Sequence, residues 1–194
     1  MTPVEILLRD LGSDDDAIRG PAWQGAASAG PPAIVPVAAL LTDPRTENAR
    51  AARRALYRIV RQAGRPGGEA DAKRAETELV ALLKSPEGRV RRTAIALLSE
   101  IGGDYAVAPL ERSLADSEVR EEARQALTRI PGSEATAALR RAHRSAPDAF
   151  RAALAESLRS RGEAVSDPAS EKDKKTPSKP TRVGQPDSTT STPA

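Results

Sequence analysis

The sequence contains no cysteine, a single histidine and only four aromatic residues, Trp23, Tyr57, Tyr105 and Phe150. Without cysteine, the chain cannot form disulfide bonds, thiolate zinc sites or a cysteine nucleophile. One histidine alone also rules out the metal sites and catalytic pairs that need two imidazoles. These scarcities exclude disulfide-stabilised scaffolds and several classes of enzyme.

Residues typical of β-strands are also scarce. Aromatic and β-branched side chains normally fill strands, whereas the hydrophobic 39% of this chain is mostly alanine, leucine, valine and isoleucine. Alanine and arginine dominate, with 36 and 24 residues. Both favour helix, because alanine loses no side-chain entropy there and arginine loses little. The composition therefore predicts an all-α fold.

Long hydrophobic runs are missing as well. The longest, residues 33–41, is broken by Pro36 and falls far short of the roughly 20 residues that cross a bilayer. The first residues include Glu5 and Asp10, where an export signal needs a basic start and an apolar stretch. We therefore expect a cytoplasmic protein. Its net charge of +3, from 30 basic and 27 acidic residues, predicts no charged partner by itself.

The composition changes abruptly at Glu163. From there to the end, Val165 and Val183 are the only large apolar residues. Such a segment cannot bury enough surface to offset the cost of ordering its backbone, about 1 to 2 kcal/mol per residue. We predict a folded domain over residues 1–162 and a disordered tail over residues 163–194. Basic and acidic residues balance in this tail, which favours a solvated segment over one that binds an acidic surface.

An internal repeat organises the folded part. Five segments share a pattern in which an apolar residue and an arginine precede apolar residues at intervals of three and four. Val90 to Gly102 and Val119 to Gly132 are the fullest copies, and the second copy has Ala49 in the arginine slot. The slots at 19, 49, 91, 120 and 151 are 30, 42, 29 and 31 residues apart. This spacing predicts one apolar stripe on a helix that glycine ends.

A shorter apolar helix precedes each of these helices, so each repeat is predicted to be a helical hairpin. We expect short oxygen side chains in the connecting turns to cap the second helices. The turns are Ser13-Asp14, Asp43-Pro44, Ser85-Pro86, Asp116-Ser117 and Ala146-Pro147-Asp148. The predicted repeats are residues 3–30, 31–64, 72–103, 104–132 and 133–162. Arg65-Pro66-Gly67-Gly68-Glu69 is interpreted as a flexible insertion between the second and third repeats.

Two helices per unit and five stacked units predict an α-solenoid. The segment Ala106-Val107-Ala108-Pro109-Leu110, with Leu114 and the run from Asp116 to Arg120, resembles HEAT repeats of the phycobilisome-lyase-like subtype. The resemblance covers about residues 3–162. It implies a right-handed alpha-alpha superhelix, an armadillo-like helical fold, and it implies little about activity.

The recurring arginines come directly after the first core residue of each second helix. In HEAT repeats a similar arginine pairs with an acidic turn residue and spaces adjacent units. The resemblance therefore implies a structural ladder formed by Arg19, Arg91, Arg120 and Arg151. A bound phosphate is the alternative role for these side chains.

The second helices of a solenoid usually line its concave face, where extended partners bind. Arginine, tryptophan and tyrosine are enriched at binding hot spots. The positions outside the apolar stripes give a candidate partner-binding surface of Trp23, Gln24, Arg53, Arg54, Tyr57, Arg58, Arg92, Ile95, Arg124, Gln125 and Arg159. An ordinary solvated face is the alternative, because surface arginines are common and Glu100, Glu121, Glu122 and Glu156 share the face.

No catalytic, cofactor-binding or metal-ligating pattern stands out. His143 is interpreted as a helix-end residue that favours the helix dipole, and no glycine-rich phosphate loop occurs. The leading hypothesis is a non-catalytic scaffold that binds another protein, without cofactor, metal or membrane. One alternative is nucleic-acid binding, which needs several arginines to neutralise phosphates. The other is a chromophore-lyase or lyase-chaperone role, suggested only by the repeat subtype, which would need a deep apolar pocket.

Overall fold

A computed structural model describes residues 1–165 of the 194-residue chain. Those residues contain ten α-helices, three short 3-10 helices and no β-strand, which confirms the all-α prediction. Residues 1–164 form one unit. Most of the predicted tail, residues 166–194, lies outside the described part of the chain.

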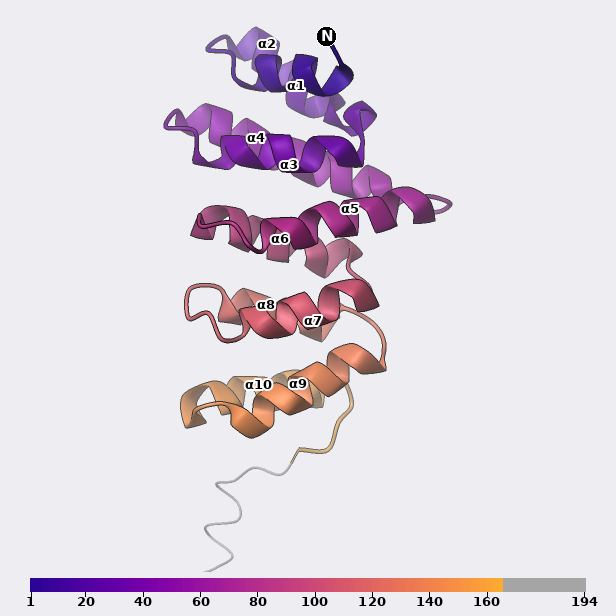
Figure 1. The fold of residues 1–194 in the computed structure, drawn as a ribbon, viewed down its shortest axis with the longest axis vertical. Coiled ribbons are helices and arrows are strands. Elements are labelled where there is room, and N and C mark those ends of the chain that lie inside the picture. Colours follow the sequence, from indigo (N-terminus) through magenta and orange to yellow (C-terminus); the bar gives the residue numbers. More distant parts are fainter. Residues whose placement is uncertain (166–194) are drawn as a thin grey trace, which may run out of the picture. The chain divides into compact units, whose positions relative to one another are not determined.

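The helices pair along the chain into five hairpins, each with a first and a second helix (Figure 1). The first helices are α1 (Pro3–Leu11), α3 (Ile34–Ala39), α5 (Glu69–Leu82), α7 (Asp104–Ser113) and α9 (Ser133–Ser145). The second helices are α2 (Asp16–Gly25), α4 (Thr46–Ala63), α6 (Gly88–Ile101), α8 (Arg120–Arg129) and α10 (Asp148–Ser160). The 3-10 helices are Ala26–Ala29, Pro31–Ala33 and Leu40–Thr42.

The five hairpins stack in chain order and form two layers of helices. Each first helix contacts the first helix of the next hairpin, and each second helix contacts the next second helix. Figure 1 shows this stack, with consecutive hairpins lying one beneath the other. The described residues therefore form an α-solenoid of five hairpins, and the predicted fold class is confirmed.

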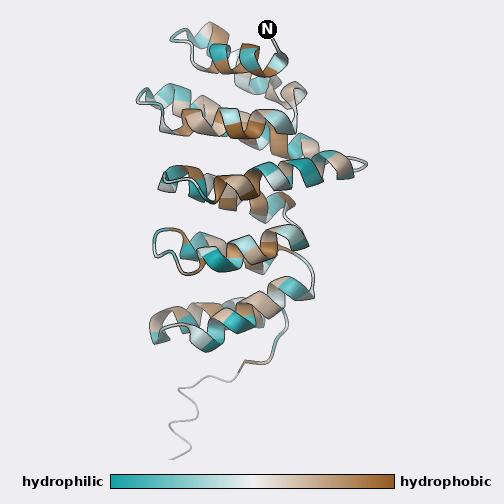
Figure 2. Ribbon diagram, in the orientation of Figure 1, coloured by the Kyte–Doolittle hydropathy of each residue, from teal (hydrophilic) through white to brown (hydrophobic). Residues whose placement is uncertain are grey.

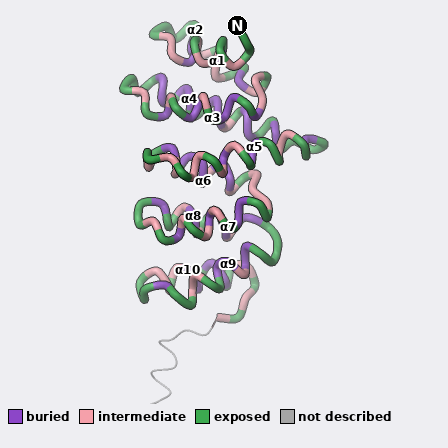
Figure 3. Tube along the Cα trace, viewed as in Figure 1, coloured by how far each residue is buried: buried purple, intermediate pink, exposed green. Residues whose placement is uncertain are grey.

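Apolar residues at intervals of three and four give each helix one buried face. In α4, Ala52, Leu56 and Ile59 follow this spacing and are at most 1% exposed. Hydrophobic and hydrophilic residues alternate along the helices (Figure 2), and the turns at the hairpin ends are largely exposed (Figure 3). Alanine supplies many buried positions and no aromatic residue is buried in the described residues. Small side chains suffice because the core is only two helices thick.

The hairpin turns use the predicted oxygen side chains, but they do not cap the second helices. Four of these side chains accept a hydrogen bond from the backbone N–H two residues later in the chain, at 2.8 to 3.2 Å. They are the side chains of Ser13, Asp43, Ser85 and Asp116. Such bonds close the turn before the helix begins. The capping prediction was therefore wrong for these residues. Among the second helices, only α2 has a side-chain cap, in which Asp15 accepts from the N–H of Ala17 at 2.8 Å.

The extra residues between the second and third repeats lengthen the helices and form the turn that joins α4 to α5. α4 runs for 18 residues and α5 for 14. Between them, the N–H of Gly68 donates to the carbonyl of Arg65 at 2.9 Å, and the Arg65 side chain donates to the carbonyl of Gln62 at 2.7 Å. Gly67 has a φ of 79°, which favours glycine. The connection between the two helices is a short turn over residues 64–68, and the flexibility of this segment stays a prediction.

The folded part also extends slightly beyond its predicted end. Glu163, the first residue of the predicted tail, forms an ion pair with Arg140 of α9. Its backbone N–H donates to the carbonyl of Leu158 at 3.0 Å. Glu163 therefore belongs to the last hairpin, because one charged contact and one backbone bond hold it there.

Candidate functional site: a groove lined by arginine side chains

One face of α4 carries a stripe of basic and aromatic residues. Its members lie at intervals of three and four residues, which makes them neighbours on the helix surface: Arg50, Arg53, Arg54, Tyr57, Arg58 and Arg61. The five arginines are exposed and Tyr57 is half-buried. The opposite face packs into the core through Ala52 and Leu56. No acidic residue interrupts the stripe.

Trp23 of α2 joins this stripe to form an open hollow of about 450 Å³. Its lining consists of Trp23, Tyr57 and the five arginines of the stripe. The guanidinium carbons of Arg54 and Arg58 lie 5.1 and 5.9 Å from the centre of the Trp23 ring. Those of Arg53 and Arg61 lie 5.9 and 5.4 Å from the centre of the Tyr57 ring. Each ring therefore holds two cations by cation–π attraction.

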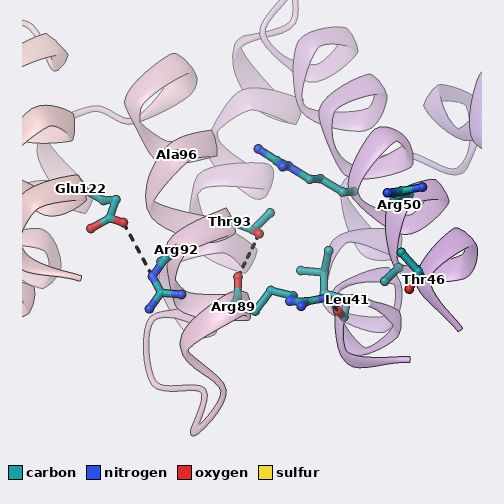
Figure 4. Close-up of a pocket in the computed structure, with 10 residues that line it drawn as sticks. Leu41, Thr46, Arg50, Arg89, Arg92, Thr93, Ala96 and Glu122 are labelled. Carbon is teal, nitrogen blue, oxygen red and sulfur yellow. Dashed lines mark hydrogen bonds and ion pairs between the residues drawn. The ribbon is translucent and has the colours of Figure 1, made fainter. Parts of the chain in front are cut away.

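A second hollow of about 450 Å³ lies between α4 and α6 (Figure 4). Its lining is Leu41, Thr46, Ala49, Arg50, Arg53, Arg89, Arg92, Thr93, Ala96 and Glu122. Arg89 extends toward Leu41 and donates to its carbonyl at 3.3 Å, while Arg92 lies 3.7 Å from the carboxylate of Glu122. Arg50 and Arg53 line both hollows. The two hollows thus join into one surface, which we call the arginine groove.

The arginines of the groove differ in their carboxylate partners. Arg50 pairs with Glu47 at 2.6 Å and Arg61 with Glu100 at 3.3 Å. Arg92 pairs with Glu118 at 2.8 Å. In contrast, the ion pairs found within residues 1–165 include none made by the remaining stripe arginines, Arg53, Arg54 and Arg58. The least neutralised part of the groove therefore lies on the middle turns of α4.

The structure brings together most of the residues that the sequence singled out for partner binding. Trp23, Arg53, Arg54, Tyr57 and Arg58 line the first hollow, and Arg92 lines the second. Sequence reasoning missed Arg50, Arg61 and Arg89, although extending the spacing of three and four residues along α4 would have found the first two.

Five residues of the predicted surface line neither hollow: Gln24, Ile95, Arg124, Gln125 and Arg159. Ile95 is fully buried, because α6 turns that side toward the core. Arg124 pairs with Glu121 and donates to the Ser157 hydroxyl of α10. This contact lowers the pKa of the Glu121 carboxyl and raises the pKa of the Arg124 guanidinium. Arg124 therefore links two second helices instead of lining the groove.

Three ladder arginines occupy the same place in their hairpins, the fourth residue of α2, α6 and α10. Each donates to a backbone carbonyl of the preceding turn: Arg19 to Ser13, Arg91 to Ser85 at 2.8 Å, and Arg151 to Ala146 at 2.7 Å. Two of them also reach the next hairpin. Arg19 donates to the Asn48 side chain at 3.4 Å. Arg91 pairs with Glu118 at 2.7 Å and with Asp116 at 3.2 Å.

Arg120 differs from the other ladder positions. The backbone before it is the same as before Arg91, because the N–H groups of Val119 and Arg120 donate to the carbonyl of Asp116 at 3.1 and 2.8 Å, as those of Val90 and Arg91 donate to the carbonyl of Glu87. The Arg120 guanidinium, however, lies 5.1 Å from the centre of the Phe150 ring of the next hairpin. Its place in the sequence repeat therefore does not give it the contacts of Arg91.

We expect that Arg91→Ala lowers the free energy of unfolding by about 1.5 kcal/mol, because it removes charged hydrogen bonds within and between hairpins. Arg120→Ala removes an exposed cation–π contact and should cost about 0.5 kcal/mol. Urea unfolding followed by circular dichroism measures both values. Equal losses in the two variants would contradict a special structural role for Arg91.

His143 offers no support for a metal or catalytic centre. Its Nε2 atom has no hydrogen-bond partner among the described residues. Burial, with smaller contributions from Arg151 and Arg159, lowers the pKa of His143. Within residues 1–165, no group of three histidine, aspartate or glutamate side chains is arranged to hold a metal ion. No helix in that range is both long and apolar enough to cross a bilayer.

Comparison with known proteins gives one family and several structural likenesses. A family model for HEAT repeats matches residues 38–128 and 77–159, without distinguishing the phycobilisome-lyase-like subtype. The search of curated proteins found no significant match.

Several similar solved structures are designed or engineered proteins. An engineered protein is 24% identical over 81% of this chain and 78% of its own, with a TM-score of 0.42. A computationally designed armadillo repeat protein for modular peptide recognition is 22% identical, over 79% of this chain and 80% of its own, with a TM-score of 0.47. A designed armadillo repeat protein in complex with the peptide (KR)4 is 21% identical at the same coverage, with a TM-score of 0.45.

Proposed function

The chain belongs to the HEAT-repeat family, and we propose that it is a non-catalytic scaffold that binds another protein along the arginine groove. Trp23, Arg53, Arg54, Tyr57, Arg58 and Arg92 are the proposed partner-binding residues. Arg124 is assigned instead to the contact between α8 and α10.

The continuity of the groove carries this proposal. The two hollows share Arg50 and Arg53, so the surface runs from Trp23 of α2, across α4 and α6, to Glu122 of α8. A partner that lies in it would contact four consecutive hairpins. Stacked repeats commonly offer an extended surface of this kind to a partner. The lining also holds tryptophan, tyrosine and arginine, the residue types that dominate binding energy in protein interfaces.

Nucleic-acid binding is the second candidate function. The first hollow favours it, because five arginines and two aromatic rings line that hollow without any acidic residue. Arginines neutralise phosphates and aromatic rings stack on bases. A chromophore-lyase role has less support, since both hollows are open and lined with arginine instead of being deep and apolar.

A peptide-display selection tests the proposed function. Random peptides are selected on the full chain and then measured on Arg54→Glu/Arg58→Glu and on the matched control Arg74→Glu/Arg144→Glu. The control arginines are exposed on the first helices α5 and α9, so both variants change the net charge equally. We expect peptides that bind the wild type and the control but lose at least about tenfold in affinity on the groove variant. Recovery of no such peptide would contradict the proposal.

A further inference from the structure

The arginines of the second helices differ in whether a carboxylate lies at ion-pair distance. Many arginines on second helices have a carboxylate at ion-pair distance, as Arg19, Arg91, Arg124 and Arg151 do. Arg53, Arg54 and Arg58 make none of the ion pairs found in residues 1–165, and all three are exposed. They lie on adjacent turns of one helix, where their positive charges add and attract an anionic group.

Aromatic rings lie beside these arginines and limit the motion of their side chains before a ligand binds. Trp23 lies beside both Arg54 and Arg58, and Tyr57 lies beside Arg53. Contact with a ring limits the motion of a long side chain, so less entropy is lost when a ligand binds. The planar guanidinium keeps N–H groups along its edge, which match the two oxygens of a carboxylate.

The spacing of the arginines fits an extended protein segment. Arg54 and Arg58 are four residues apart in α4, which corresponds to a rise of roughly 6 Å. In an extended chain, alternate side chains point to the same side at intervals of about 6.5 Å. Two acidic side chains at alternate positions therefore match the two guanidinium groups.

Acidic residues border the stripe on several sides. Glu47 lies near the start of α4, Glu100 pairs with Arg61 toward its end, and Glu122 lies beside Arg92 across the second hollow. A nucleic-acid strand carries one negative charge about every 3.4 Å. A strand that continued beyond the middle of α4 would meet these carboxylates, whereas a short acidic segment fits between them.

We infer that the arginine groove selects an extended segment of a partner protein that presents two acidic side chains at alternate positions, to Arg54 and Arg58. This inference rests on the proposed function and specifies the chemistry of the partner. Arg53 adds positive charge to the same site, and Trp23 supplies the apolar surface beside it.

Trp23 also makes the inference easy to test, because it is the only tryptophan of the chain. The probe is a short capped peptide with glutamates at two alternate positions, titrated into the full chain at low salt. A peptide with glutamines at those positions is the matched control probe. Trp23 emission reports on the site, and calorimetry repeats each titration so that binding without a change in emission is also measured.

We expect saturable binding of the glutamate peptide, at least about tenfold tighter than that of the glutamine peptide. Added salt should weaken it, because the groove is exposed and ions screen its charges. Arg54→Glu/Arg58→Glu should abolish binding, whereas Arg74→Glu/Arg144→Glu should retain it. Circular dichroism checks that each variant is folded.

Three results would overturn the inference. The first is equal binding of the two peptides, and the second is no binding of the glutamate peptide by either method. The third is tighter binding of single-stranded oligothymidylate, lost in the Arg54→Glu/Arg58→Glu variant, which would favour nucleic acid. The peptide-display selection distinguishes a failure of this inference from a failure of the proposed function. Groove-dependent peptides without acidic residues would leave the proposed function standing and overturn only the acidic partner.

Discussion

Arg161→Ala is expected to lower the free energy of unfolding by about 3 kcal/mol, because one side chain there holds several groups of the last two hairpins. The Arg161 guanidinium donates to the Thr136 hydroxyl of α9 at 2.8 Å. It also donates to the backbone carbonyls of Leu127, Thr128, Ile130 and Gly132 at 2.6 to 3.1 Å. These carbonyls lie at the end of α8 and just after it, where a helix presents its negative pole.

The controls for Arg161 separate charge from geometry. Arg161→Lys retains the charge but cannot supply a planar set of donors, so it should recover less than half of the loss. Arg129→Ala removes an exposed arginine of α8 and should cost less than about 0.5 kcal/mol. A loss for Arg161→Ala as small as that for Arg129→Ala would contradict the prediction.

The position of Trp23 gives a second measurement of the same variant. Solenoid stability is close to a sum over neighbouring repeats, so a weakened last hairpin can unfold before the rest. Trp23 lies in α2, at the other end of the stack from α10. In urea, circular dichroism should show an earlier onset of unfolding for Arg161→Ala, while Trp23 emission should change later. Coincident transitions would indicate that the five hairpins unfold as one unit.

Glu76→Ala is expected to lower the free energy of unfolding by about 2.5 kcal/mol, since it leaves two backbone donors without their partner. Glu76 of α5 is only 8% exposed. Its carboxylate accepts from the N–H of Gly103 at 2.7 Å and from the N–H of Ala106 at 3.1 Å. Both donors lie at the start of α7, the positive pole of that helix.

Glu76→Gln is the matched control for this contact. Glutamine keeps an oxygen acceptor of similar reach but removes the charge, so it should cost about 1 kcal/mol. Urea unfolding of both variants gives the two values. If alanine and glutamine cost the same, the hydrogen bonds to α7 would not be the source of the stability.

The sequence predicted the architecture well because hairpin repeats are encoded locally. The spacing from Val90 to Gly102 specifies one helix and its end, and the same frame recurs along the chain. Five hairpins in one stack follow from that recurrence, since each exposed apolar face needs a neighbour to cover it. The recurring arginines Arg19, Arg91 and Arg151 could be identified from the sequence for the same reason.

Errors arose where the contacts of a side chain depend on the neighbouring hairpin. Arg120 stands in the arginine slot, but its side chain lies beside the Phe150 ring of the next hairpin, whereas Arg91 donates to the preceding turn. Arg161 stands where Ile101 and Ile130 stand in other repeats, and no feature of the sequence indicated that it would bind the end of α8. Both outcomes depend on which hairpin lies beside the residue.

By itself, the amino-acid sequence determined the all-α class, the hairpin repeat and the basic stripe of α4, because helical periodicity is a property of neighbouring residues. The tertiary structure alone decided that Trp23 meets Arg54 and Arg58, that two hollows join at Arg50 and Arg53, and that Glu76 and Arg161 bind the poles of other helices. These contacts join residues more than 20 positions apart. They depend on how the hairpins dock, and docking is set by the packing of whole helix faces.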